Sequence, residues 1–580
     1  MGLVCLLLII ALIGTFCGLI SNKILRIRLI NFRENLFEKC KGGLLWGFIL
    51  LFFNLIYWAG NIGSIIILIF FSPSFNLGLL FCLDPLWYSF IYIVARMGFD
   101  RIFGDSPIKP YLQTDIALFS EGYRKIFQVL EINLNAPLGK LRHRWTMPAG
   151  KYIACYLWDS AFISQIWKYW DQNVAAEILL SILENQAEDG QIAHFISFIS
   201  KSNKTQPPLL AWAIANLETN TQYLKTAYFK LKKYNQWLYQ NRRLENGLFF
   251  WMHSYESGID NSPRFTDRSE KQQFDLTNRA AIDLNTFMVL QNQSLIKIAK
   301  KLKIKENDED FDKDIKEFKG KNQVLIELIQ QFLWDRDAGL YFDYDCSKKE
   351  QIRINTIVSF FPLIAGIPTQ YQAEHLIEHL KNPEEYNTLI PLPTVALNDE
   401  TFEKDTWRGP MWVNTAYLII KGLERYGQFQ LSSEFAFRII RAVFKTWENE
   451  GSFYEFYDPE RFDLVELTRK KGNLWKQITL GGKPVKNFIG WTGLVNSLFI
   501  ESVIGFDQIE KTIQPRLPPE LKGKSITLGF PKLSFEMEIK YSDEKNISVI
   551  LTDLTGTRPR LHKSCELFQR ISLGEFFDTR

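Results

Sequence analysis

The sequence predicts a large all-α domain that is preceded by a membrane region and followed by a small β-rich region. Apolar residues recur at three- and four-residue intervals between about residues 110 and 510, which is typical of amphipathic helices. Long uncharged apolar runs are confined to residues 1–100, and alternation of apolar and polar residues begins after residue 515. We therefore expect three parts, at residues 1–100, 110–510 and 515–580.

The N-terminal part is expected to form two or three transmembrane helices. Residues 3–20 and 44–72 carry no charge, and residues 76–95 are mostly apolar. A bilayer requires about 20 such residues per helix. The alternative is a cleaved signal peptide followed by buried helices, but the first run lacks the usual basic segment and the second is too long. The number of spans stays open because Asp84 and Pro85 interrupt the third run.

Residues 21–43, which connect the first two apolar runs, are expected to lie in the cytoplasm. It carries six basic residues, and basic connectors stay on the cytoplasmic side. With three spans the large domain is also cytoplasmic, whereas with two spans it lies outside. Arg96, Arg101 and Lys109 follow the third run and favour three spans. We therefore predict an integral membrane protein and favour a cytoplasmic domain, although the side of the membrane stays open with the number of spans.

Composition excludes several other classes of function. The 580 residues include 68 basic and 64 acidic ones, so the net charge of +4 gives no support to nucleic-acid binding. The seven cysteines show neither disulfide nor zinc-site spacing, and we expect no metal and no cofactor. Aromatic residues make up 14% of the chain and suit sugar binding, because aromatic rings pack on the apolar faces of sugars.

Particular segments support the helical and β-rich parts. Residues 174–184 and 414–424 have the apolar spacing of amphipathic helices. In the last part, residues 524–530, 533–541 and 546–552 alternate with a period of two, which predicts strands of a small sheet.

Two carboxylates lie in unusual surroundings for solvated loops. Asp260 belongs to a segment, residues 255–265, that combines Gly, Asn and Pro with aromatic residues. Glu455 lies between aromatic residues in segment 453–459. Two carboxylates that only folding brings together are what the cleavage of a glycosidic bond needs.

An ordered series of motifs resembles glycoside hydrolase family 63, which includes processing α-glucosidases and mannosylglycerate or glucosylglycerate hydrolases. The series is more distantly similar to the trehalases of family 37. The resemblance covers about residues 115–505 and implies that the helices form an (α/α)6 toroid. The motifs lie at residues 157–162, 206–208, 255–265, 281–285, 406–412, 453–459 and 488–493.

The resemblance implies an inverting glycosidase in which Asp260 is the general acid and Glu455 the general base. A poorly solvated aromatic setting would favour the protonated form of the acid. The base must hold a water on the opposite face of the sugar, so we expect the carboxyl groups to lie roughly 6.5 to 9.5 Å apart.

Other motif residues are expected to bind the sugar. Trp158 would pack on the ring while Asp159 accepts hydrogen bonds from sugar hydroxyls; the alternative is a buried Trp beside a helix-capping Asp. For Asp283 and Asp458 we favour structural roles. The remaining predicted binding residues are Gln206, Arg264, Trp407, Arg408, Trp412 and Trp491.

Two functions from different classes fit these residues. The first is a membrane-anchored inverting hydrolase of an α-glucoside or α-mannoside, such as an oligosaccharide, a glycosylglycerate or a glycolipid head group. The second is a non-catalytic carbohydrate-binding membrane protein on the same fold. Retention of both carboxylates favours the enzyme. The sequence departs from the family pattern at Ile259, Phe456 and Glu460, and it leaves the sugar, the aglycone and the oligomeric state open.

Overall fold

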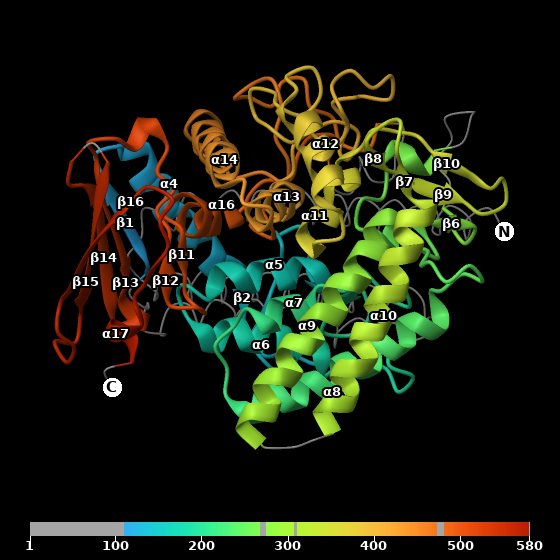
Figure 1. Ribbon diagram of the computed structural model, residues 1–580, viewed down its shortest axis with the longest axis horizontal. Coiled ribbons are helices and arrows are strands. Elements are labelled where there is room, and N and C mark those ends of the chain that lie inside the picture. The colour runs from blue at the N-terminus through green and yellow to red at the C-terminus, as the bar shows by residue number, and fades with distance from the viewer. Residues whose placement is uncertain (1–108, 267–273, 307–309, 472–480, 544, 579–580) are drawn as a thin grey trace, which may run out of the picture. The chain divides into compact units, whose positions relative to one another are not determined.

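The computed structural model describes residues 109–580, apart from 267–273, 307–309, 472–480, 544 and 579–580 (Figure 1). These described residues belong to one compact unit. The predicted transmembrane runs lie within residues 1–100 and therefore outside the described residues. Within the described part, no helix combines the length and the apolar character that crossing a membrane requires.

Six helices form a closed inner ring in the described part of the chain. Each helix packs against the next in the order α5, α7, α9, α11, α13 and α16, and α16 packs back against α5. Every residue of α5, α7 and α16 is buried, as expected for helices enclosed on all sides. The inner helices are Leu157–Trp167, Leu210–Ala215, Ile282–Glu306, Pro362–Ala365, Val413–Arg425 and Leu494–Leu498, and a π-helical turn, Phe499–Val503, continues the last.

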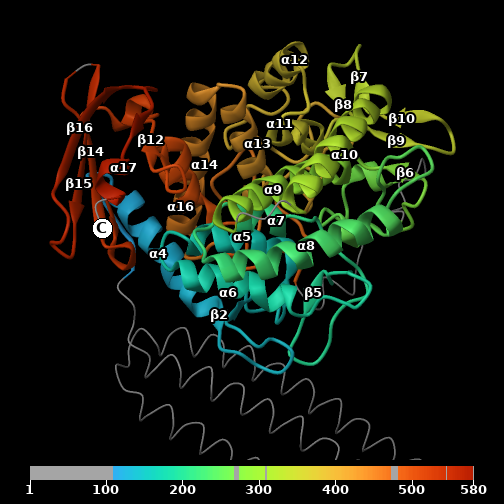
Figure 2. The same cartoon turned by 60° about the horizontal axis from the view of Figure 1, so that its bottom comes forward.

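Six outer helices alternate with the inner ones along the chain. They pack on the ring through pairs such as α5 with α6, α9 with α10 and α13 with α14, while α4 and α14 meet where the chain closes the circle. Figures 1 and 2 show α6 and α8 side by side on the outside, and the two helices are in contact. This alternation is the predicted (α/α)6 toroid. The outer helices are α4 (Ala117–Asn133), α6 (Gln172–Leu183), α8 (Thr221–Asn241), α10 (Asp310–Phe332), α12 (Gln370–Lys381) and α14 (Phe429–Glu450).

Local sequence signals set several helix boundaries. Asp171 precedes α6, and its carboxylate accepts hydrogen bonds from the backbone N–H of Asn173 and of Val174 at 3.0 and 3.2 Å. A capping box, made by Thr369 and Gln372, begins α12. The two helical segments predicted at 174–184 and 414–424 are confirmed as α6 and α13.

A five-stranded antiparallel sheet lies beside the toroid, with strand order β1-β13-β14-β15-β16 (Figure 1). The three predicted strands are confirmed as β13 (Ser525–Phe530), β14 (Phe535–Tyr541) and β15 (Asn546–Asp553). Neither β16 (Leu561–Glu566) nor β1 (Tyr111–Thr114) was predicted. The expected boundaries placed β1 in the helical part, yet Tyr111 pairs with Gly529 of β13. The sheet thus joins the two ends of the described chain.

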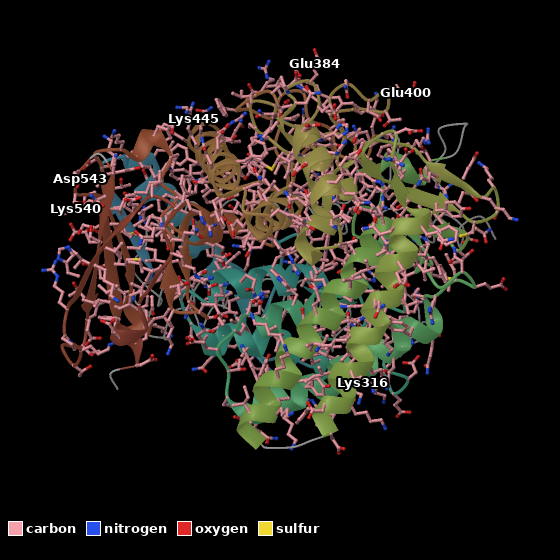
Figure 3. All side chains as sticks on the ribbon, viewed as in Figure 1. Lys316, Glu384, Glu400, Lys445, Lys540 and Asp543 are labelled. Carbon is pink, nitrogen blue, oxygen red and sulfur yellow. The ribbon has the colours of Figure 1, made fainter. Side chains whose placement is uncertain are left out.

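Short sheets connect the remaining segments. Charged side chains such as Lys316 and Glu384 project from the periphery of the molecule (Figure 3). A short helix, α17 (Gly574–Phe577), lies close to the C-terminus. The short sheets are β2 (Leu134–Asn135) with β3 (Trp145–Thr146); β4 (Cys155–Tyr156) with β5 (Phe195–Ile196); β6 (Arg279–Ala280), β9 (Asp343–Asp345) and β10 (Glu350–Ile352); β7 (Trp334–Asp335) with β8 (Leu340–Tyr341); and β11 (Phe506–Asp507), β12 (Thr512–Ile513) and β17 (Ile571–Ser572).

Candidate active site

The loop that carries Asp260 is fixed by a buried carboxylate four residues earlier. Glu256 lies in a short 3-10 turn, and its two oxygens accept hydrogen bonds from Arg242 at 2.7 and 2.9 Å. The backbone N–H of Met252 donates a further bond to Glu256 at 3.0 Å. A buried, bidentate ion pair with an additional donor holds a loop in one conformation. The loop can therefore present Asp260 in a defined direction.

Gly258 brings this loop directly onto Trp158. The φ angle of Gly258 is 74°, in the left-handed region that glycine adopts without strain. A Cβ atom at this position would overlap the indole ring of Trp158. The acid loop and the Trp158 motif, 100 residues apart in the sequence, are therefore in van der Waals contact.

The four predicted tryptophans form one cluster, and Trp158 of this cluster contacts the acid loop. Trp407 and Trp412 are stacked, with centroids 3.6 Å apart and ring planes inclined by 10°. Trp491 lies edge-on to Trp158 and to Trp412, at 5.4 Å from each. Three separate motifs thus contribute to a single apolar wall, and aromatic surfaces of this kind can pack on the face of a sugar ring.

Asp159 lies in the first turn of α5 beside this wall and is buried. Burial raises its pKa to about 8, and the nearby Glu455 adds to the rise, while the backbone N–H of Asp159 opposes it. The carboxyl group is therefore protonated at neutral pH and can donate a hydrogen bond, whereas the sequence predicted only an acceptor. Gln206 lies alongside, and its side-chain oxygen accepts a hydrogen bond from the Trp158 backbone N–H at 3.4 Å.

Glu455 is buried and held by three donors. The Arg469 Nε donates at 2.5 Å, the Val485 N–H at 3.2 Å and the Tyr152 hydroxyl at 3.3 Å. The Trp491 indole N–H donates to the backbone carbonyl of Glu455 at 3.0 Å. Hydrogen bonds and a guanidinium favour the ionised form of a carboxylate. Glu455 therefore has the setting of a base.

Asp260 has a different setting from the one that the sequence predicted. Its carboxylate forms an ion pair with the ammonium of Lys470, and its side chain is 15% exposed. An ammonium in contact with a carboxylate favours the charged form, whereas the aromatic setting expected for an acid favours the neutral form. Tyr152 and Arg469 lie in electrostatic range of both Asp260 and Glu455. The two carboxylates therefore share one site.

Asp405 connects the loops around this site. One of its oxygens accepts a hydrogen bond from Asn261, next to Asp260, at 2.9 Å. Its other oxygen accepts bonds from the Thr468 hydroxyl at 2.9 Å and from the Lys471 backbone N–H at 3.0 Å. Asn261 also accepts a bond from the Trp407 N–H at 3.1 Å. The acid loop, the loop that carries Trp407 and the segment that carries Arg469 and Lys470 are thus tied together.

Two predicted binding residues are engaged in ion pairs. Arg264 is buried and pairs with Asp283 and with Asp343, at 2.9 Å from the latter. Asp283 also accepts a hydrogen bond from Trp251 at 2.9 Å, in keeping with the structural role expected for it. Arg408 lies 3.3 Å from Glu403 on a part-exposed loop. The structure thus does not join either guanidinium to the tryptophan cluster. Asp458 is fully buried and pairs with Lys404 at 3.0 Å.

Several site residues were not predicted from the sequence. Tyr152, Asp405, Arg469 and Lys470 all contact a candidate catalytic carboxylate or the loops that hold it. The basic run at 469–471 resembles an ordinary solvated segment, and only its position after Glu455 could have drawn attention to it.

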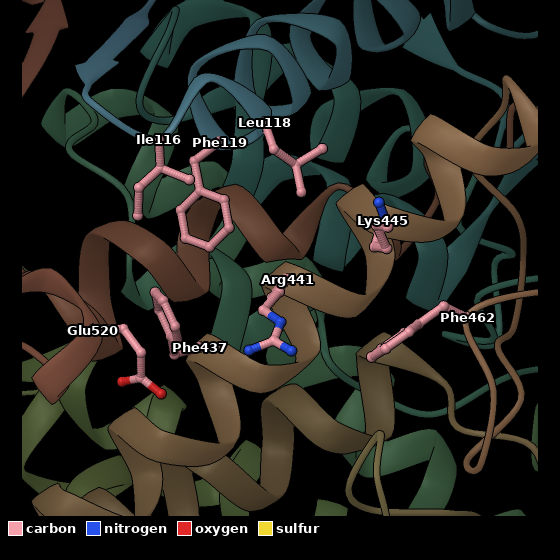
Figure 4. Close-up of a pocket in the computed structure, with 8 residues that line it drawn as sticks. All are labelled: Ile116, Leu118, Phe119, Phe437, Arg441, Lys445, Phe462 and Glu520. Carbon is pink, nitrogen blue, oxygen red and sulfur yellow. The ribbon is translucent and has the colours of Figure 1, made fainter.

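Two cavities lie away from the candidate carboxylates. A groove of about 300 Å³ lies beside α4 and α14 and is lined by the residues in Figure 4, among them Phe437 and Arg441. A cavity of about 330 Å³ lies at the other end of the inner helices, away from the end that carries Trp158 and Asp159. Lys168, Lys421 and Glu501 line it. Neither Asp260 nor Glu455 lines either of these cavities.

The fold and the paired carboxylates define a six-hairpin glycosidase, and the comparison with known families agrees. Residues 152–464 match the mannosylglycerate hydrolase MGH1-like glycoside hydrolase domain, which is more than half of the chain. The chain belongs to this family and is a glycoside hydrolase. The match includes Asp260 and Glu455 and ends before Arg469 and Lys470.

Individual relatives support the same classification. The chain is 28% identical over 400 residues to the mannosylglycerate hydrolase of Thermus thermophilus, covering 55% of this chain and 92% of that protein. It is 26% identical over 359 residues to an uncharacterized protein of Borreliella burgdorferi, covering 58% and 70% of the two chains. The crystal structure of a GH63 mannosylglycerate hydrolase from Thermus thermophilus in complex with glucose has a TM-score of 0.52 at 24% identity, covers 65% of this chain and 99% of that chain, and shows the shared fold.

Proposed function

We propose that this protein is an inverting hydrolase of an α-mannoside or α-glucoside whose aglycone carries a negative charge, with Asp260 as general acid and Glu455 as general base. One observation carries the proposal: two carboxylates share a site, and each is held by one of two consecutive basic residues, Arg469 and Lys470. A pure sugar-binding protein needs no such pair.

Glu455 would act on the attacking water. Its bonds to Arg469 and to the Val485 N–H orient the carboxylate, so one oxygen can take a proton from water as the oxygen of that water bonds to the anomeric carbon. Asp260 would donate its proton to the glycosidic oxygen as the old bond breaks. Attack from the face opposite the leaving group inverts the anomeric configuration.

The surrounding residues would position the sugar. The wall of Trp158, Trp407, Trp412 and Trp491 supplies an apolar surface for the ring. Protonated Asp159 would donate a hydrogen bond to a sugar oxygen. Because these groups are fixed by the inner helices that carry them, the sugar would be held in one orientation.

Three basic side chains support an anionic aglycone. Arg469 and Lys470 form ion pairs with Glu455 and Asp260, and Lys151 lies in electrostatic range of Arg469 and Glu455. Burial lowers the pKa of Lys151, as does Arg469, while Glu455 opposes the fall. A cluster of cations is stabilised by a negatively charged ligand. The name of the Thermus relative refers to mannosylglycerate, a glycoside with a carboxylate on its aglycone. A glycolipid head group with a phosphate has the same charge, whereas a neutral oligosaccharide does not.

Proton NMR of the full chain during hydrolysis tests this proposal. The panel comprises α-mannosylglycerate, α-glucosylglycerate, a glycosyl phospholipid head group and a neutral α-linked disaccharide. Initial release of the β-anomer from an anionic substrate, abolished in both Asp260→Asn and Glu455→Gln, is the expected result.

Three other outcomes would contradict the proposal. Initial release of the α-anomer would exclude inversion. Equal rates on the neutral disaccharide would exclude the anionic aglycone. Saturable sugar binding without hydrolysis by wild type would support the non-catalytic alternative instead.

A further inference from the structure

Arg469 and Lys470, which we name the clamp segment, bind the two candidate catalytic carboxylates. The guanidinium of Arg469 forms an ion pair with Glu455, and the ammonium of the next residue, Lys470, forms an ion pair with Asp260. The backbone of the clamp segment is anchored, because the Lys470 backbone N–H donates to the Thr406 hydroxyl at 2.8 Å and the backbone N–H of the following residue, Lys471, donates to Asp405 at 3.0 Å. Lys470 also has a φ of 52°, which is uncommon for a residue with a side chain. The surrounding loops therefore hold the backbone of Lys470 in place.

The two pairs of the clamp segment differ in their consequence for catalysis. A general base must be oriented toward the attacking water, and the guanidinium of Arg469 orients Glu455 through a hydrogen bond at 2.5 Å. A general acid must be protonated, and Lys470 opposes that state of Asp260. Among the described residues, the titratable or charged groups in range of Asp260 include Lys470, Arg469, Tyr152 and His194.

Among these four groups, only Lys470 can release Asp260. Arg469 and Tyr152 both donate hydrogen bonds to Glu455, and Arg469 also donates one to the Tyr152 hydroxyl at 2.5 Å. Both side chains are therefore held at the base. Burial lowers the pKa of His194 to about 4, so its ring is neutral at physiological pH and adds no charge. Departure of Lys470 from Asp260 would therefore favour uptake of a proton by the acid.

We propose that Lys470 is a positioning residue that couples the charge of the aglycone to the protonation of Asp260, an inference that rests on the proposed function. In the free enzyme Lys470 binds Asp260. When a substrate with an anionic aglycone binds, the ammonium moves to that anion, and Asp260 takes one proton from solvent. Asp260 then gives this proton to the glycosidic oxygen, while Glu455 takes one from the attacking water. One water is consumed and no oxidation occurs.

The chemistry of the two basic residues suits this division of roles. The side chain of Arg469 is 4% exposed and is fixed between Glu455 and Tyr152. Lys470 ends in a compact ammonium on a flexible stem, so its charge can move while its backbone stays bound to Thr406. A neutral aglycone offers no competing anion, so Lys470 would stay on Asp260 and the chemical step would be slow. Discrimination by charge should therefore be seen in kcat and not only in KM.

The test compares two substrates that differ at one group, α-mannosylglycerate and α-mannosylglycerol, with the full-length enzyme. Wild type is expected to have a higher kcat on the anionic substrate. Lys470→Met should raise kcat on the neutral substrate about tenfold or more, because an adjacent opposite charge shifts a carboxyl pKa by about 1 to 3 units. The alkaline limb of its pH–rate profile on that substrate should also move to higher pH. Lys470→Arg keeps the charge and should keep the preference.

Lys471→Met is the matched control, since it removes the same charge one residue further along, from an exposed side chain. It should leave both kcat values unchanged. Equal loss of kcat on both substrates in Lys470→Met, or an unchanged preference, would overturn the inference. Failure of the proposed function would be seen differently, as activity that survives Asp260→Asn or as release of the α-anomer by wild type.

Discussion

The two ends of the inner helices use charged residues in opposite ways. At the N-terminal ends lie Trp158 and Asp159 of α5 and Trp412 just before α13, next to Asp260 and Glu455. At the other end, Glu501 accepts hydrogen bonds from the Tyr169 and Tyr417 hydroxyls at 2.8 and 2.7 Å and pairs with Lys168 at 2.9 Å. Both ends therefore contain buried carboxylates with cationic partners.

The difference lies in where the partners come from. Burial of Glu501 would raise its pKa, but Lys168 and Lys421 lower it to about 2, and both are carried by inner helices or their ends. Asp260 and Glu455 instead pair with a loop, the clamp segment. Ion pairs between packed helices fix a structure, whereas pairs that a loop makes can be exchanged for pairs with a ligand. Variants at the two ends should accordingly separate stability from activity.

The largest expected effect is on catalysis. Asp260→Asn should lower kcat/KM by about 10² to 10⁴, the usual contribution of a general acid, with little change in the melting temperature because Asp260 is partly exposed. Glu455→Gln should lose activity to a similar extent and also lose stability, since it leaves the buried Arg469 without its carboxylate. Kinetics and thermal unfolding of both variants measure this contrast. A stable Glu455→Gln enzyme would show that the Arg469 pair contributes nothing to the fold.

Glu501→Ala should produce the opposite pattern. Removing one partner of a buried ion pair destabilises a protein by about 3 to 5 kcal/mol, while the folded fraction should keep its kcat. Glu448→Ala removes an exposed partner of Lys445 and should change stability by less than about 1 kcal/mol. Urea unfolding of the full chain provides the comparison. Loss of kcat in folded Glu501→Ala protein would mean that the two ends are coupled.

Asp159 gives the site a pH-dependent stability. Its folded pKa of about 8 exceeds the usual 3.8, so between these values the unfolded state ionises while the folded carboxyl stays neutral, and stability falls as pH rises. Asp159→Asn does not titrate. Its stability relative to wild type should therefore increase from pH 5 to pH 7, by about 1 to 3 kcal/mol. Measurement of the free energy of unfolding of both proteins at pH 5 and pH 7 tests this. A difference between variant and wild type that is the same at both pH values would contradict it.

An effect of similar size on stability is expected at the contact of the acid loop with Trp158. Gly258→Ala places a Cβ in a left-handed conformation and against the indole, which should cost about 1 to 3 kcal/mol and lower kcat. Gly427→Ala is the control, because Gly427 has a similar φ of 73° and open space around it. Equal effects of the two substitutions on kcat would show that the Trp158 contact is unimportant for activity.

Much of this arrangement could be predicted because its signals are local. The helical spacing at 414–424 and the alternation in 533–541 depend only on neighbouring residues, and both segments were assigned correctly. The prediction of the toroid rested on the order of the motifs and the family that they resemble, and not on the helical periodicity. The four residues of β1 are too few to show alternation, and their partner lies at the far end of the chain.

Partners of charged side chains were the least predictable part. Nothing near Asp260 in the sequence indicates Lys470, and nothing near Arg264 indicates that Asp283 and Asp343 would occupy its guanidinium. Such pairs are made by tertiary packing between segments far apart in the chain. The tryptophans could be placed at the site from their motifs, because an apolar ring needs only a common wall and no single partner.

The pairing of β1 with β13 has a consequence for the synthesis of the protein. Tyr111 donates a hydrogen bond to Glu536, which is 425 residues further along the chain. At about 5 to 20 residues per second, a ribosome needs about 20 to 85 s to cover that distance. During this time the nascent chain holds an unpaired strand that contains Tyr111 and Leu112, and such an edge is prone to pair with other chains. The nascent chain would therefore be exposed to aggregation until translation has passed β13, at Ser525–Phe530.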